Sequence, residues 1–196
     1  MHVFALSTKS TAPFPAVAYN NASTSDDANP GAASLAGTYS YSAQALQKAG
    51  LTPGGSLTVN GTSFIWPSGI AQKNNYVANG QVVPVNAIYG ANTLAFLGSS
   101  TAGPSSGKII ITYADGTTQT ETLGMSDWAL GGGNQTPSFG NRVIATMSYC
   151  NRSTSQQNVK NNVFYSEITL TNYKVSVKSI TLPGNSHLHI FSVATR

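Results

Sequence analysis

The chain has 196 residues and a mass of 20.4 kDa, which suits one domain with a full hydrophobic core. Hydrophobic residues make up 40% of it and charged residues 8%, a balance that argues against intrinsic disorder. The net charge of +4 reflects ten Lys and Arg residues that form no basic cluster, so we expect no nucleic-acid binding. No apolar run approaches the roughly 20 residues of a membrane helix, so we expect no membrane insertion.

The first eight residues repeat the pattern of the last strand that we expect in the chain. Residues 1–8 read MHVFALST and residues 188–195 read LHIFSVAT, with His, Phe and Thr in the same register. Either two strands of similar alternation coincide, or residues 1–8 are the last strand of a preceding repeat in a tandem array. We favour the second interpretation, in which residues 9–15, with Pro13 and Pro15, are a linker and residues 16–196 form the module.

An acidic loop follows the linker. Asp26, Asp27 and Asn29 place three oxygen-bearing side chains within four residues. Hard cations prefer oxygen ligands, so the loop is a candidate site for a structural calcium ion. The alternative is an Asx-rich turn without a metal. A multi-thiolate metal site is excluded because Cys150 is the single cysteine.

The rest of the chain predicts short strands and turns, with one short helix over residues 42–49, where Ser42 is the N-cap and Gly50 ends the helix. Asn60-Gly61 predicts a hairpin between residues 57–59 and 62–66. Further strands are expected over residues 82–85, 93–97, 108–113, 117–123, 142–150, 161–170, 175–182 and 188–193. The pattern predicts an all-β fold, a β-sandwich of jelly-roll or galactose-binding-like type.

Motifs of catalysis are weak in this sequence. Residues 103–107 match the nucleophile string G-x-S-x-G, but a β-branched run follows where a helix is needed, so we expect a turn. His187 and His189 share one strand face, as zinc ligands can, yet His189 corresponds to His2 in the terminal repeat, which favours a structural role. Cys150 is expected to be a buried strand thiol. We find no opposed pair of carboxylates, so we expect no enzyme.

Aromatic residues beside turns carry the binding hypothesis. An aromatic ring can pack against the apolar face of a sugar, while carboxylates and amides bind its hydroxyl groups. Tyr39 and Tyr41 share one strand face, Trp66 ends a strand, and Trp128 follows Asp127 and precedes three glycines. These five are the candidate ligand-binding residues, and core packing is the alternative for either tryptophan.

A series of short motifs in order resembles a known family. The motifs are Tyr19-Asn20-Asn21, residues 25–30, 39–46 and 49–54, Phe64-Ile65-Trp66-Pro67, residues 94–98 and 113–117, Ser126-Asp127-Trp128 and Leu188-His189-Ile190-Phe191. Together they resemble a non-catalytic β-sandwich accessory module of large secreted bacterial glycoside hydrolases, including α-mannosidase-type and fucosidase-type enzymes. The resemblance covers residues 14–195. It implies a secreted or extracellular module that is linked to catalytic or repeat domains of the same polypeptide, and it assigns no ligand-binding residues.

The sequence therefore predicts a non-catalytic carbohydrate-binding or accessory module. A weak sugar site would raise the local substrate concentration for a linked catalytic domain. The alternative is a structural spacer or adhesion-type repeat without a small-molecule site. Exposed aromatic residues on a concave face would favour sugar binding, whereas aromatic residues buried in the core would favour the spacer.

Overall fold

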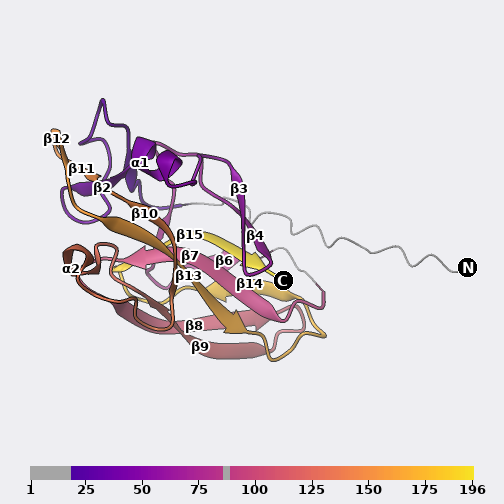
Figure 1. Cartoon of the computed structure of the whole chain (residues 1–196). Coiled ribbons are helices and arrows are strands. Elements are labelled where there is room, and N and C mark those ends of the chain that lie inside the picture. Colours follow the sequence, from indigo (N-terminus) through magenta and orange to yellow (C-terminus); the bar gives the residue numbers. More distant parts are fainter. Residues whose placement is uncertain (1–18, 86–88) are drawn as a thin grey trace, which may run out of the picture.

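The computed structural model describes residues 19–85 and 89–196 (Figure 1). Within these ranges the chain is an all-β sandwich with two short helical segments, so the predicted fold class is confirmed. The strand expected at residues 1–8 and the linker expected at residues 9–15 lie outside the described residues.

The elements have the following bounds. The helices are α1 (Ala43–Lys48) and α2 (Leu130–Gly133). The strands are β1 (Thr24–Ser25), β2 (Tyr39–Ser42), β3 (Ser56–Val59), β4 (Thr62–Ile65), β5 (Tyr76–Val77), β6 (Val82–Pro84), β7 (Thr93–Ser100), β8 (Ser105–Tyr113), β9 (Thr118–Met125), β10 (Arg142–Met147), β11 (Cys150–Arg152), β12 (Ser155–Gln157), β13 (Asn161–Thr169), β14 (Val177–Thr181) and β15 (Leu188–Thr195).

The sandwich consists of a five-stranded and a four-stranded sheet. The first has the strand order β10-β13-β7-β15-β5 and the second has the order β6-β14-β8-β9. The central strand β7 is buried at every position because both of its faces are covered. Leu94 and Phe96 face the core between the two sheets, and Ala95 and Leu97 face a second core on the other side.

A third layer covers that second face of the five-stranded sheet (Figure 1). It consists of the small sheet β1-β2-β11-β12, the hairpin β3–β4 and the helix α1. The core beneath it is rich in aromatic side chains, including those of Tyr41, Phe64, Trp66, Trp128 and Phe191. The candidate aromatic residues therefore belong to the contact between the third layer and the sandwich.

Local sequence signals predicted a turn and a helix cap correctly. The hydroxyl of Ser42 accepts a hydrogen bond from the backbone N–H of Ala45 at 3.0 Å, as an N-cap does. Gly50, with a φ of 91°, follows the helix. Asn60 and Gly61 have φ values of 47° and 74°, as the two-residue turn of a right-twisted hairpin requires. The helix and the first hairpin are thus confirmed.

The strand predicted over residues 142–150 is wrong in its second half. β10 ends at Met147, and β11 starts at Cys150 and pairs with β2 in the small sheet. Tyr149 lies at the crossing, where its hydroxyl donates to Asp27 at 2.6 Å and its carbonyl accepts from the Asn161 side chain at 2.9 Å. These long-range bonds hold the bend, and no local pattern encodes them.

A second irregularity lies in β15. Its register with β7 shifts between Ile190 and Ser192, so Phe191 is an extra residue, as in a β-bulge. Ile190 and Val193 face the core between the two sheets, and Phe191 faces the core under the third layer. The bulge therefore sends Phe191 and Val193, two residues apart, to opposite faces.

Candidate functional site

Four of the five candidate ligand-binding residues lie in one chain of aromatic rings. The ring of Trp128 lies 6.0 Å from that of Tyr39 and 5.9 Å from that of Tyr41. Tyr41 contacts Phe191, which stacks on Trp66. The exposed fractions are 0% for Tyr41, 3% for Trp66 and 7% for Trp128, so these three rings fill the core and offer little surface to a sugar.

Tyr39 is the end of this chain that reaches solvent. It is half-buried, and the guanidinium carbon of Arg152 lies 5.0 Å from the centroid of its ring. This geometry is that of a cation–π contact. No local pattern points to Arg152, because the contact arises from pairing between β2 and β11. Tyr39 is the candidate aromatic residue whose ring a ligand can reach without opening the core.

Asp127 holds the loop that carries α2. Its carboxylate accepts hydrogen bonds from the backbone N–H groups of Gly103 at 3.2 Å, Ala129 at 3.2 Å and Gly131 at 3.3 Å. The loop turns in the left-handed sense, with φ values of 46°, 59°, 77° and 91° from Leu130 to Gly133. Glycine is the residue that adopts this conformation at least cost, which explains the three glycines.

The acidic loop forms a hydrogen-bonded network around the start of α1. Asp26 accepts from the backbone N–H of Ala28 at 2.8 Å and from the side chain of Gln44 at 2.8 Å. Asp27 accepts from the hydroxyl groups of Ser42 at 2.5 Å and Tyr149 at 2.6 Å. The bond to Ala28 is the first cause of a lowered pKa of Asp26. Every carboxylate oxygen in the loop thus has a donor.

Asn29 lies apart from this network. Its side chain is exposed, and its backbone N–H donates to the carbonyl oxygen of Asp26 at 2.9 Å. In residues 19–85 and 89–196, no group of three or more His, Cys, Asp or Glu side chains could hold a metal ion. The hydrogen bond from the backbone N–H of Ala28 to Oδ1 of Asp26 is that of an Asx turn, and calcium binding at this loop stays a prediction.

A surface cavity of about 470 Å³ lies beside the small sheet. Its lining consists of small, hydroxyl or amide residues and contains no charged side chain: Asn21, Ala22, Gly31, Ala32, Ala33, Ser34, Gly37, Thr38 and Ser153. The walls meet closely at Gly31, where an added Cβ would lie 2.5 Å from the carbonyl oxygen of Ser153. Thr38 and Ser153 directly adjoin Tyr39 and Arg152 in the sequence.

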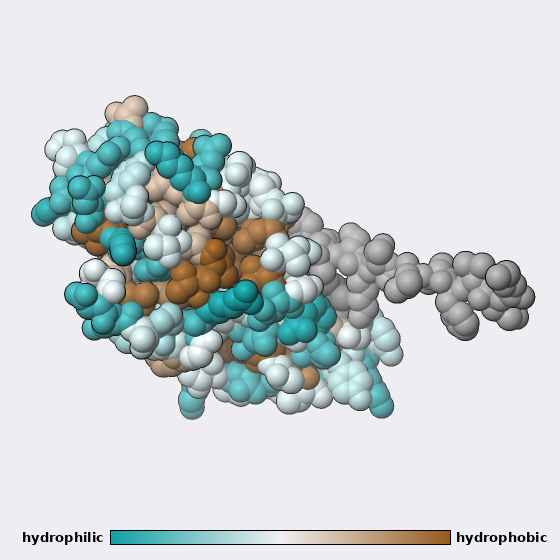
Figure 2. Space-filling model, in the orientation of Figure 1, coloured by the Kyte–Doolittle hydropathy of each residue, from teal (hydrophilic) through white to brown (hydrophobic). Residues whose placement is uncertain are grey.

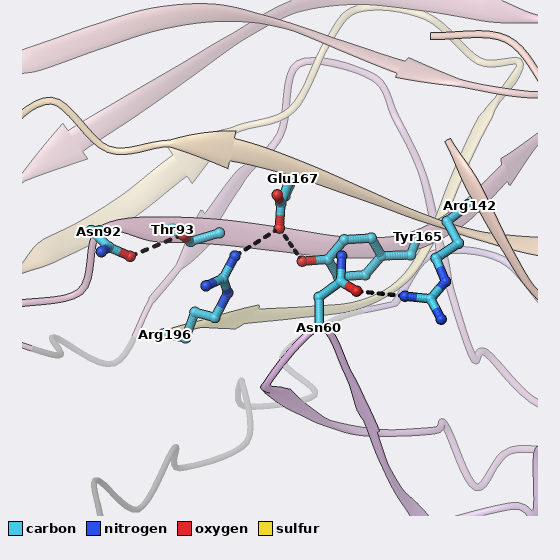
Figure 3. Close-up of polar contacts among 7 residues, drawn as sticks. All are labelled: Asn60, Asn92, Thr93, Arg142, Tyr165, Glu167 and Arg196. Atoms are coloured by element: carbon cyan, nitrogen blue, oxygen red, sulfur yellow. Dashed lines mark hydrogen bonds and ion pairs between the residues drawn. The ribbon is translucent and has the colours of Figure 1, made fainter. Parts of the chain in front are cut away.

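A second groove, of about 340 Å³ and with both polar and apolar walls, lies between β3 and β10. Its lining residues are Ala49, Gly50, Leu51, Leu57, Thr58, Val59, Asn60, Arg142, Val143 and Ile144. Figure 2 shows that apolar side chains gather across the middle of this view, between hydrophilic regions. A hydrogen bond of 2.5 Å from Arg142 to Asn60 joins the hairpin turn to β10 (Figure 3).

A polar cluster occupies the end of β15. Glu167 accepts a hydrogen bond from the hydroxyl of Tyr165 and pairs with Arg196 at 3.1 Å (Figure 3). These two partners hold the pKa of Glu167 below its usual value. Both members of the ion pair are largely exposed, so the pair adds little stability.

The remaining reactive side chains have structural surroundings. His189 is 3% exposed, its Nδ1 lies 3.2 Å from Oδ1 of Asn75, and burial together with His187 lowers its pKa to about 4. His187 is exposed and its Nδ1 lies 3.5 Å from the hydroxyl of Thr101. Cys150 is buried, and burial raises the pKa of its thiol to about 11. The predicted buried thiol is thus confirmed.

The two packed sheets and the buried aromatic core define a β-sandwich module. The chain matches the family model of the AziU2-like beta-sandwich domain over residues 12–196 and therefore belongs to that family. No curated protein matches the chain. In the described residues, no helix has the length and apolar character needed to cross a membrane.

Proposed function

We propose that the domain is a non-catalytic carbohydrate-binding module of a larger secreted carbohydrate-active enzyme. The observation that carries the proposal is the uncharged cavity between the loop of residues 31–38 and Ser153. Its volume lies within the range of roughly 300–1,000 Å³ typical of small-ligand sites. Hydroxyl, amide and backbone groups can exchange hydrogen bonds with a neutral sugar, and the lining holds no cation for an anionic ligand.

The aromatic contribution in this proposal belongs to Tyr39. Trp66, Trp128 and Tyr41 would have to leave the core before a sugar could stack on them. Tyr39 and Arg152 adjoin the cavity in the sequence, and the Tyr39 ring is half-buried. A sugar extending beyond the cavity would meet this edge, where an aromatic side chain and a guanidinium group offer packing and hydrogen bonds.

The module would act by targeting. A weak glycan site keeps a linked catalytic domain near its polymeric substrate and so raises the local substrate concentration. Secretion and the link to glycoside hydrolases rest on the resemblance of the motifs to accessory modules of such enzymes. The low charge and the surface rich in hydroxyl and amide groups agree with that setting.

Binding can be tested by titrating the isolated domain with neutral mannose-containing and fucose-containing oligosaccharides, followed by NMR. We expect shifts at the cavity residues. Ala33→Trp fills the cavity and is expected to weaken binding at least tenfold. Ala114→Trp, in the exposed turn between β8 and β9, is the matched control and should retain the affinity. Absence of binding, or equal affinity of the Ala33→Trp variant, would overturn the proposal.

A structural spacer is the second candidate function. The burial of Trp66, Trp128 and Tyr41 favours it, because a spacer uses its aromatic residues for packing alone. The same titration separates the two functions. If the domain is a spacer, none of the oligosaccharides will change the chemical shifts of its NMR signals.

A further inference from the structure

The five-stranded sheet has one place for a strand such as β15. That place lies between β7 and β5, and residues 188–195 fill it. Residues 1–8 have the same pattern but lie outside the family match, which begins at residue 12. We infer that the sequence of residues 1–8 is the C-terminal sequence of a preceding copy of this domain, so that a second, covalently linked copy is a partner of this one. This inference stands independently of sugar binding.

The histidine of the repeat is the first supporting position. His189 is buried and lies 3.2 Å from the side chain of Asn75. Burying an imidazole without a partner is costly, so a histidine belongs at this position only where a hydrogen-bond partner lies opposite. His2 stands at the equivalent position in residues 1–8. The environment that makes a histidine suitable here belongs to this fold and not to β-strands in general.

The bulge supplies a second and more specific argument. Because Phe191 is an extra residue, β15 needs large apolar side chains at 190, 191 and 193 instead of at alternating positions. Residues 1–8 have Val3, Phe4 and Leu6 at the corresponding places. A strand with regular alternation would put Phe4 and Leu6 on one face. The segment therefore reproduces the irregular pattern of β15.

The remaining positions agree with the burial of β15. Thr195 is 2% exposed and is matched by Thr8. Half-buried Ser192 and buried Ala194 both have small side chains, and they are matched by Ala5 and Ser7. Phe191 also meets fixed partners, since it stacks on Trp66 and its carbonyl oxygen accepts a hydrogen bond from Tyr19 at 2.7 Å. The identical phenylalanine in residues 1–8 fits such surroundings.

A strand transplant tests the inference in the full chain. The variant L188M/I190V/S192A/V193L/A194S gives β15 the sequence of residues 1–8. Volume-conserving exchanges in a core cost little, so we expect its melting temperature to lie within about 5 °C of that of the parent.

The control variant exchanges the residues at positions 192 and 193 of the transplanted strand. The variant L188M/I190V/S192L/V193A/A194S has the same composition but places leucine at the half-buried position 192 and alanine at the buried position 193. We expect it to melt at least about 5 °C below the transplant. A transplant as unstable as this control would overturn the inference.

A deletion completes the test. Removing residues 1–8 is expected to leave the melting temperature within about 2 °C of the parent value, because the remaining chain holds a full copy with its own β15. A drop beyond about 5 °C would show that the segment belongs to this copy and would overturn the inference.

Discussion

The indole ring of Trp66 stacks on the phenyl ring of Phe191, with centroids 5.0 Å apart and an angle of 30° between the planes. Trp66 follows β4 in the outer layer, and Phe191 is the bulge residue of β15 in the sandwich. The contact therefore ties the third layer to the central sheet, and we expect the third layer to lose its attachment when either ring is removed.

Truncation of Trp66 tests this role. Trp66→Ala is expected to lower the free energy of unfolding by roughly 3–5 kcal/mol, because it empties a buried site of its largest side chain. Urea denaturation followed by circular dichroism measures the change. Tyr173→Ala, at a ring that is 52% exposed, is the control and should stay within about 0.5 kcal/mol. If Trp66→Ala has the same free energy of unfolding as the parent, the indole ring is not needed for packing and stays a candidate platform for a sugar.

The hydroxyl of Tyr41 makes a separate contribution. It donates to the carbonyl oxygen of Asn162 at 2.6 Å within the core. Tyr41→Phe keeps the ring and leaves that carbonyl without this donor, so we expect a loss of about 1–2 kcal/mol in urea denaturation. A variant as stable as the parent would show that another donor replaces the hydroxyl.

His189 makes stability depend on pH. Its pKa is lowered from 6.5 to about 4 by burial and by the neighbouring charge of His187. Below pH 6.5 the unfolded chain takes up a proton that the folded chain does not bind until about pH 4, so acidification favours unfolding. The contribution of this group falls by roughly 3 kcal/mol across that window. Urea midpoints measured between pH 7 and pH 4 should decline less in His189→Gln than in the parent.

Removal of divalent cations tests the acidic loop. Asp26 and Asp27 already have a hydrogen-bond donor on each carboxylate oxygen. We therefore expect EDTA to leave the melting temperature unchanged. A structural calcium ion would stabilise the fold by mass action, so a higher melting temperature in millimolar calcium would establish a metal site at this loop.

The left-handed turn of α2 can be tested with one methyl group. Gly132 has a φ of 77° and open space around an added Cβ, so Gly132→Ala should cost about 1 kcal/mol through backbone conformation alone. Gly184 also has open space but no left-handed φ, and Gly184→Ala is the matched control. Equal stability of the two variants in urea denaturation would contradict the idea that the left-handed backbone at position 132 disfavours alanine.

The sequence predicted the elements whose signals are local. The turn at Asn60-Gly61 and the cap at Ser42 follow from the conformations that these residues adopt on their own. Alternation likewise identified most long strands, because one or both of their faces are buried.

The features that sequence reasoning missed depend on partners far along the chain. The bend at Tyr149 is held by Asp27, and the cation over Tyr39 comes from Arg152. The bulge at Phe191 places Phe191 and Val193 in cores on opposite faces of the sheet, and alternation along the strand does not predict it. Glu167 and Tyr165 share a strand face, which alternation could have suggested, but their partner Arg196 had no local signal.

The position of β15 in the sheet has a consequence for biosynthesis. This strand is the last of the domain's strands in chain order, yet it lies between β7 and β5 and contributes to both cores. Until it emerges, the nascent chain presents an open strand edge on β7 and an unfilled place beside Trp66. Open edges invite pairing with other chains. Folding of each copy must therefore be completed after translation of its final residues, and the interval before that is when the chain is most exposed to aggregation.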